Sequence, residues 1–437
     1  MKPERVLRRR GPVFLTFNSG GSVPIDVKVN PMLAAVVCLI LSVAPALPAQ
    51  STSSSSTTAA PGTAGSAPAA AAAAPLSTFV LTGPLQWLPP AEFDAGPFGK
   101  LAVNGIVTGY AQGQNHPMPG DDTQQATLSN GEIFIQKADG RVQYFVQAGA
   151  YTMPTLGAPF LDAQDTMQQF FGPVPVAFLK LATGKSTTWQ IGELPTLMGA
   201  ESTFTYQNFN IQRGLLWAQE NAVNRGIQVN QALGKYLTAS FSWNDGYYSD
   251  RYSWLSGSLT FTKGANSLAY QGMGNLSQTA FRTAATPVQN NSAMHAIVDT
   301  YTKGAWVASA YYQFSDVPTS LKAGVPKGAT TNGFGAFLSR SFAHGLALPG
   351  RFEYIAQSGT AGGAAVNLLY GPGSSATSFT VTPTYQKGGF YFRTDLAYVR
   401  AINGTAGDAF GPLGNQAGQF RAAGEFGFIF GDNVVKK

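Results

Sequence analysis

The chain has 437 residues, and its 28 Lys and Arg against 22 Asp and Glu give a formal net charge of +6. Only 11% of the residues are charged, against roughly 25% in soluble domains, whereas Phe, Tyr and Trp make up 12%. Since no apolar run reaches the roughly 20 residues that a spanning helix needs, the composition argues against a helical membrane protein. It favours a transmembrane β-barrel, with a soluble β-sandwich or solenoid as the alternative.

The first 49 residues are typical of a secretory signal peptide. Basic residues precede a short apolar core, 32–43, and small residues follow it up to Ala49, where we expect cleavage, with Ala46 as the alternative. Removing this leader leaves 22 basic and 20 acidic residues, so the overall positive charge gives no argument for binding nucleic acid. The single cysteine, Cys38, lies in the leader, so the mature chain offers no disulfide and no thiolate metal ligand.

Two segments precede the expected barrel. Residues 50–77 are mostly Ser, Thr, Ala and Pro and cannot bury a core, which predicts a disordered linker. Residues 78–99 contain large apolar side chains interrupted by prolines, which predicts a periplasmic lead-in that either tucks into the barrel or only connects to it. The barrel is expected over 100–431, followed by a C-terminal tail, 432–437.

From Lys100 onward, apolar and polar residues alternate with the period of two that strands require. In the segment 236–244, Leu237, Ala239, Phe241 and Trp243 share one side, and Ser, Thr and Asn take the other. One apolar and one polar face is the pattern of a barrel with lipid outside and water inside.

Short Gly-containing turns alternate with longer loops along this region, because Gly supplies the positive φ that tight hairpins need. Seven short turns and eight longer loops predict 16 antiparallel strands, with 14 or 18 as alternatives. The weakest part of this assignment is 366–385, where Pro372 and Pro383 interrupt the pattern. The longer loops are 112–126, 153–175, 195–221, 245–252, 275–291, 315–331, 359–378 and 402–418.

The loop 195–221 is too long for a hairpin connection, and such loops are usually either functional or disordered. It is rich in large apolar and aromatic side chains, which favours a loop that folds into the barrel and narrows it over a surface loop whose aromatics merely pack. The charged residues predicted at this constriction are Glu201, Arg213, Glu220 and, just beyond the loop, Arg225. Charges at a narrowing would set ion preference.

The same stretch carries a family resemblance. Residues 192–201, Gly-Glu-Leu-Pro-Thr-Leu-Met-Gly-Ala-Glu, the segment 208–216, Asn-Phe-Asn-Ile-Gln-Arg-Gly-Leu-Leu, and Arg225-Gly226 resemble the signature region of bacterial outer-membrane β-barrel porin family 2, the OmpL-like porins. The resemblance is clearest over about 40 residues, and the strand-turn rhythm agrees from about Lys100 to the end. It implies an outer-membrane barrel and says little about the solute.

Further charges fall on the polar side of the predicted strands. By alternation they face the lumen, either selecting solutes or bracing the wall in pairs. These residues are Lys180, Arg351, Glu353, Arg393 and Asp395.

The last strand, 419–430, has aromatic residues on one side and resembles the closing strand that the barrel-assembly machinery binds in outer-membrane proteins, although residues follow its final Phe430. Enzyme signatures are weak, since His295, predicted on the polar side of its strand with Asp299, has no Ser in a recognisable motif beside it.

We therefore predict a non-enzymatic outer-membrane porin, without cofactor or metal, that passes small hydrophilic solutes or ions by diffusion. Its expected partners are outer-membrane lipid, the permeating solutes and the assembly machinery, and a homo-oligomer stays open. The alternatives are a non-conducting anchor or adhesion scaffold and a membrane-embedded hydrolase.

Overall fold

The computed structural model describes residues 83, 85–277 and 293–432. The predicted signal peptide and linker, most of the predicted tail and most of the loop 275–291 lie outside these residues. Antiparallel strands dominate the described part. They are β1 (Ala91–Asp94), β2 (Lys100–Gln114), β3 (Gln124–Lys137), β4 (Val142–Tyr151), β5 (Val176–Ala182), β6 (Thr187–Pro195), β7 (Val223–Ala232), β8 (Leu237–Asn244), β9 (Trp254–Lys263), β10 (Asn266–Asn275), β11 (Ala293–Lys303), β12 (Trp306–Val317), β13 (Ala329–Ser341), β14 (Leu346–Gln357), β15 (Ser375–Val381), β16 (Thr384–Lys387), β17 (Phe390–Ile402) and β18 (Gly418–Phe430).

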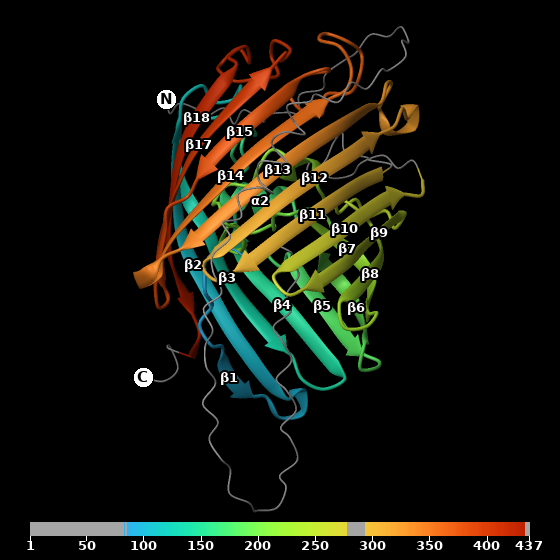
Figure 1. Cartoon of the computed structure of the whole chain (residues 1–437), viewed down its shortest axis with the longest axis vertical. Helices are drawn as coiled ribbons and strands as arrows, with labels where there is room; N and C mark the ends of the chain where they lie inside the picture. Colours follow the sequence, from blue (N-terminus) through green and yellow to red (C-terminus); the bar gives the residue numbers. More distant parts are fainter. Residues whose placement is uncertain (1–82, 84, 278–292, 433–437) are drawn as a thin grey trace, which may run out of the picture. The chain divides into compact units, whose positions relative to one another are not determined.

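The strands close into a barrel. Each strand from β2 to β14 pairs with the next, β17 pairs with β18, and β18 returns to pair with β2 in a register that runs from Arg421 opposite Gln114 to Phe430 opposite Gly105. Figure 1 shows the blue β2 beside the red β18 at this closure. Both β15 and β16 pair with β14 and β17, so together they form one strand of the wall. The barrel therefore has 16 strands, as predicted.

The break between β15 and β16 falls at Thr382 and Pro383. Proline has no backbone N–H to donate to the ladder, so pairing stops there and resumes one residue later. This break lies in the segment 366–385, where the assignment from the sequence is weakest, and the residues before Ser375 belong to a loop.

Alternate side chains face opposite sides of the wall. On β17, Phe392 and Leu396 are 44% and 49% exposed, whereas their neighbours Arg393 and Asp395 are fully buried inside. On the closing strand, Phe420, Phe426, Phe428 and Phe430 are similarly exposed on the outside. The predicted pattern of an apolar outer face opposite an inner face that carries charge is confirmed on both strands.

Connections at the two ends of the barrel differ in length. Seven connections of two to four residues alternate with eight longer ones, of which the segments 152–175, 196–222 and 358–374 are the longest described in full. Within the described residues the helices are short: α2 (Ala163–Gln169) and the 3-10 helices η1 (Gly96–Phe98), η2 (Thr205–Gln207), η3 (Trp217–Gln219), η4 (Leu321–Ala323) and η5 (Ala343–Gly345). Helix α2 begins after Asp162, whose carboxylate accepts the N–H of Asp165 at 2.8 Å. None of these helices has the length and apolar character needed to cross a membrane.

The described part of the lead-in, from Gly83 onward, lies against the short-turn end of the barrel. β1 pairs with the first residues of β2, and Gln86 exchanges two 2.7 Å hydrogen bonds with Gln386. Trp87, which lies between Gln86 and β1, packs edge-on against Phe134 and Tyr206 inside the barrel. The lead-in therefore contacts the barrel interior.

The two faces should respond differently to a buried charge. Leu259 lies near the centre of β9 and is 44% exposed on the outside, and its neighbour Thr260 is half-buried on the inside. Leu259→Arg should cost about 2–4 kcal/mol if it lies at the membrane midplane, because the guanidinium would meet lipid. Thr260→Arg should cost less, since its side chain can reach the polar interior. Urea unfolding in lipid vesicles measures both, and equal losses would contradict the assigned faces.

Candidate functional site

The segment Thr196–Ala222, which we call the interior loop, is folded inside the barrel. It connects β6 to β7, and none of its residues is exposed; only those at positions 197, 207, 217 and 218 are half-buried. A loop at that depth has no water to satisfy its backbone, so its N–H and C=O groups must find partners in the protein.

Carboxylates accept most of the N–H groups in the stretch 211–216. Asp395 on β17 accepts the N–H groups of Ile211 and Gln212 at 3.1 and 2.8 Å. Glu353 on β14 accepts those of Leu215 and Leu216 at 3.0 and 3.1 Å.

The two N–H groups between these pairs are also bonded. That of Gly214 donates to Glu201 of the interior loop itself at 2.7 Å, and that of Arg213 donates to the carbonyl of Pro154 at 2.9 Å. Six consecutive N–H groups of the loop therefore have acceptors, five of them on carboxylates, which form stronger hydrogen bonds than neutral groups do.

Arginines of the wall bind the carbonyls of the same loop. Arg393 donates to Asn208 and Thr205 at 3.0 and 3.1 Å, and Arg351 donates to Gln212 at 2.8 Å. Each arginine is also ion-paired: Arg393 with Glu425 on β18, and Arg351 with Glu201 and, at 3.3 Å, with Glu353. Burying these charges would be costly if they were single, so the pairs and the backbone contacts stabilise one another.

Strands β10 and β12, on the next part of the wall, bind the loop through neutral groups. The amide of Gln271 on β10 accepts the N–H of Gly199 at 2.7 Å and donates to its carbonyl at 3.1 Å. On β12, Tyr311 and Gln313 donate to the carboxylate of Glu220 at 2.5 and 2.8 Å. The interior loop thus starts from β6, ends at β7 and is bonded to a run of strands from β10 to β18, so it crosses the interior.

Apolar contacts complete this attachment. Leu215 and Leu216 of the loop pack in one buried cluster with Met294, Ala296 and Val298 of β11. The inward residues of β11 at positions 294, 296 and 298 are therefore apolar, whereas β14 and β17 carry buried charges as well as apolar residues of this cluster, and β18 carries buried charges.

The residues predicted at a constriction fall into two groups. Glu201, Arg213 and Glu220 lie in the interior loop and are at most 6% exposed. The guanidinium of Arg213 donates to the carbonyl of Thr203 at 2.9 Å and lies 5.2 Å from the centre of the Trp217 ring. Arg225, half-buried at the start of β7, instead pairs with Asp245 at 2.8 Å and covers the ring of Tyr248.

The predicted lumen-facing residues are also distributed unevenly. Arg351, Glu353, Arg393 and Asp395 are buried against the interior loop, as described above, whereas Lys180 is half-buried on β5. Sequence reasoning missed Glu425 and Arg421 on β18. Both lie opposite the exposed Phe residues, so the alternation already noted on that strand could have found them.

The buried Glu220 carboxyl lies in the interior loop, outside the membrane-spanning strands. Burial raises its pKa well above the ordinary value, and the hydrogen bonds from Tyr311 and Gln313 counteract this only in part. Its second oxygen has no hydrogen-bond partner.

Comparison with known proteins identifies the family. The family described as "putative beta-barrel porin-2, OmpL-like" matches residues 100–430, which is most of the chain. The chain belongs to this porin family. No curated protein matched it.

Solved porin-like barrels share the fold at low sequence identity. The outer membrane channel DcaP of Acinetobacter baumannii is 9% identical with a TM-score of 0.53, covering 78% of this porin and 100% of DcaP. Outer-membrane expressed OmpT of Vibrio cholerae is 12% identical with a TM-score of 0.52, covering 76% of this porin and 98% of OmpT. The predicted porin family, closed barrel and location in the bacterial outer membrane are therefore confirmed.

One sequence prediction about this porin is wrong. His295 and Asp299 lie on the exposed outer side of β11, and His295 is 2.7 Å from the hydroxyl of Tyr270. Met294, Ala296 and Val298, on the other side of this strand, point inward and pack in the same apolar cluster as Leu215 and Leu216 of the interior loop. His295 therefore does not face the interior, and within the described residues no cluster of three metal-ligating side chains occurs.

The ion pairs that hold the loop predict a stability effect. Arg351→Met should destabilise the porin by about 3–5 kcal/mol, because Glu201 and Glu353 would keep buried charges without their partner. Arg400→Met, a matched change of an exposed arginine on β17, should stay within about 0.5 kcal/mol. Unfolding in lipid vesicles, followed by gel mobility, measures both. Equal effects of the two substitutions would show that the buried pairs contribute nothing.

Proposed function

We propose that this porin lets small hydrophilic solutes cross the outer membrane passively, through a passage that the interior loop restricts. The observation that carries the proposal is the position of this loop, which starts from β6 and ends at β7, lies inside the barrel and is bonded to β10, β12, β14 and β17 and, through Thr205 and Glu425, to β18. A 16-stranded porin barrel without such an insertion would enclose a wide aqueous channel. The loop therefore makes the passage narrower and more selective than the barrel alone.

We further propose that Glu201, Arg213, Glu220 and Arg225 border the narrow part. Three of them belong to the loop itself, and charges act strongly on a passing solute where little water surrounds it. Lys180, half-buried on β5, would then lie in the wider part that leads to the short-turn end, together with the half-buried Gln231 and Ser240. Arg351, Glu353, Arg393 and Asp395 would act indirectly, by fixing the loop.

The arrangement of the chain across the membrane follows from the same family membership. We propose that the long loops face the outside and the short turns face the periplasm, as in other bacterial barrels. Residues 1–49 would direct export and be removed, residues 50–77 would link the mature N-terminus to the barrel, and outer-membrane lipid would surround the exposed apolar face. Whether several copies assemble is left to experiment, and we propose no enzymatic role.

Single-channel recording in planar bilayers tests the restriction. Deleting residues 203–215 should raise the conductance several-fold, because it removes the part of the loop bonded to β14 and β17 and lets water fill the space. The barrel should still fold, which heat-dependent gel mobility can show. An intact porin that conducts as much as the deletion variant would refute the restriction. Absence of conductance from both would favour the non-conducting anchor over a channel.

A further inference from the structure

A small cavity opens beside the interior loop at the long-loop end of the barrel. Its volume is about 60 Å³. One water needs roughly 10–15 Å³ of such cavity volume. The cavity therefore has room for about four waters or for a polar group of similar size. Three connections form its wall, namely those between β4 and β5, β6 and β7, and β8 and β9.

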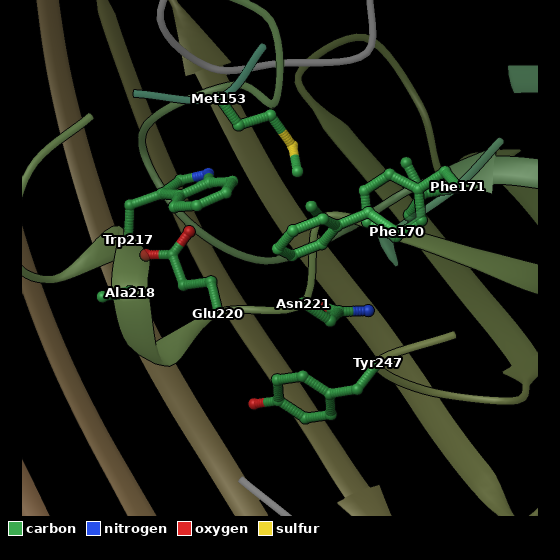
Figure 2. Close-up of a pocket in the computed structure, with 10 residues that line it drawn as sticks. Met153, Phe170, Phe171, Trp217, Ala218, Glu220, Asn221 and Tyr247 are labelled. Atoms are coloured by element: carbon green, nitrogen blue, oxygen red, sulfur yellow. The ribbon is translucent and has the colours of Figure 1, made fainter. Parts of the chain in front are cut away.

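Four aromatic rings contribute to the lining of the cavity. Phe170 and Phe171 come from the connection between β4 and β5, Trp217 from the interior loop, and Tyr247 from the connection after β8 (Figure 2). Phe170 and Trp217 are only half-buried, so the cavity is reachable from outside. Faces of such rings attract cations through their quadrupoles, and several together form the usual recognition element for organic ammonium groups.

A carboxylate completes the lining. Glu220 is 6% exposed, and its Oε1 accepts hydrogen bonds from Tyr311 and Gln313, but its Oε2 has no partner. None of the ion pairs among the described residues includes Glu220. The cation of the interior loop, Arg213, does not pair with Glu220. Its guanidinium stacks on Trp217 and donates to the carbonyl of Thr203.

A buried donor lies next to this acceptor. Asn221 is 1% exposed, and its carbonyl oxygen accepts a 2.5 Å hydrogen bond from Thr196, whereas its Nδ2 has no partner. Buried polar atoms without partners are rare in folded proteins and call for a water, an ion or a ligand. Here one unpaired acceptor and one unpaired donor lie on adjacent residues that line the same cavity.

We propose that this cavity binds a small organic ammonium ion that also carries an oxygen acceptor. The ammonium group would donate to Glu220 Oε2 and lie against the aromatic rings, and the oxygen would accept from Asn221 Nδ2. A neutral molecule of the same size can donate a hydrogen bond to the carboxylate but brings it no opposite charge and gains no cation–π attraction from the rings, so charge rather than shape determines binding. The site shares Glu220 with the proposed narrow part of the passage, but its occupancy is measured as binding and does not depend on conduction.

The protonation of Glu220 makes the affinity for the ammonium ion depend on pH. Burial raises the pKa of Glu220 in the empty cavity, Tyr311 and Gln313 on β12 lower it, and Glu201 in the loop and Glu353 on β14 raise it. Because the ammonium ion binds the ionised carboxylate, binding releases a proton, and affinity should fall as the pH falls. Arg213, the cation of the same loop, lies over Trp217 and forms no ion pair with Glu220.

Calorimetric titration of the full-length porin in detergent tests the site with ethanolamine hydrochloride as the probe. The matched ligand is ethylene glycol, which has the same number of heavy atoms but no charge, and sodium chloride at equal ionic strength controls for salt. We expect saturable binding of ethanolamine, with proton release, and none of ethylene glycol. Equal binding of both ligands, or no saturable binding of ethanolamine, would overturn the proposal.

Variants then locate the binding. Glu220→Gln keeps an acceptor for Tyr311 and Gln313 but removes the charge, and it should weaken ethanolamine binding roughly tenfold or more. Phe170→Leu, at the half-buried rim, should weaken it roughly two- to fivefold through loss of one ring and stays informative if Glu220→Gln fails to fold. Asp122→Asn removes an exposed carboxylate from another long loop and should leave binding unchanged. Unchanged binding in both Glu220→Gln and Phe170→Leu would place the ligand elsewhere.

Discussion

The structure depends on the need to satisfy the backbone of a long segment buried inside a barrel. A barrel wall satisfies its own N–H and C=O groups by strand pairing, but an inserted loop cannot do so. In this porin the wall supplies the missing partners as side chains: Asp395 and Glu353 for N–H groups, and Arg393 and Arg351 for carbonyls. The charges of the interior are therefore primarily structural groups that fix the loop, and any effect on solutes follows from where they hold it.

This constraint also explains why the two sides of the interior differ. The side formed by β14, β17 and β18 must neutralise backbone dipoles, so it carries ion-paired charge. The side formed by β11 receives Leu215 and Leu216, so its inward residues are apolar. A short stretch of backbone, 211–216, accordingly faces carboxylates through its N–H groups and apolar wall through its leucine side chains. Such two-sided contact holds the loop in one position, which a passage of defined width requires.

Much of the wall was predictable from the sequence because its determinants are local. Alternation along β17 and the closing strand identified the outer face, and Gly-containing turns gave the strand number. The entry of the interior loop into the barrel was expected from its apolar residues. Its partners were not, because Ile211 and Asp395 are separated by 184 positions and only the closed register brings them together. His295 was assigned to the wrong side for the same reason: a rule that places polar residues inside fails where a distant segment makes the interior apolar.

Hydrogen–deuterium exchange of the intact porin in lipid vesicles tests the central claim most directly. If wall carboxylates fix the interior loop, the amides of residues 211–216 should exchange about as slowly as those of β17, although they belong to no strand. Exchange of these amides as fast as in the partly exposed connection 403–417 would contradict the account, since it would mean that the loop leaves the wall freely and cannot define the passage.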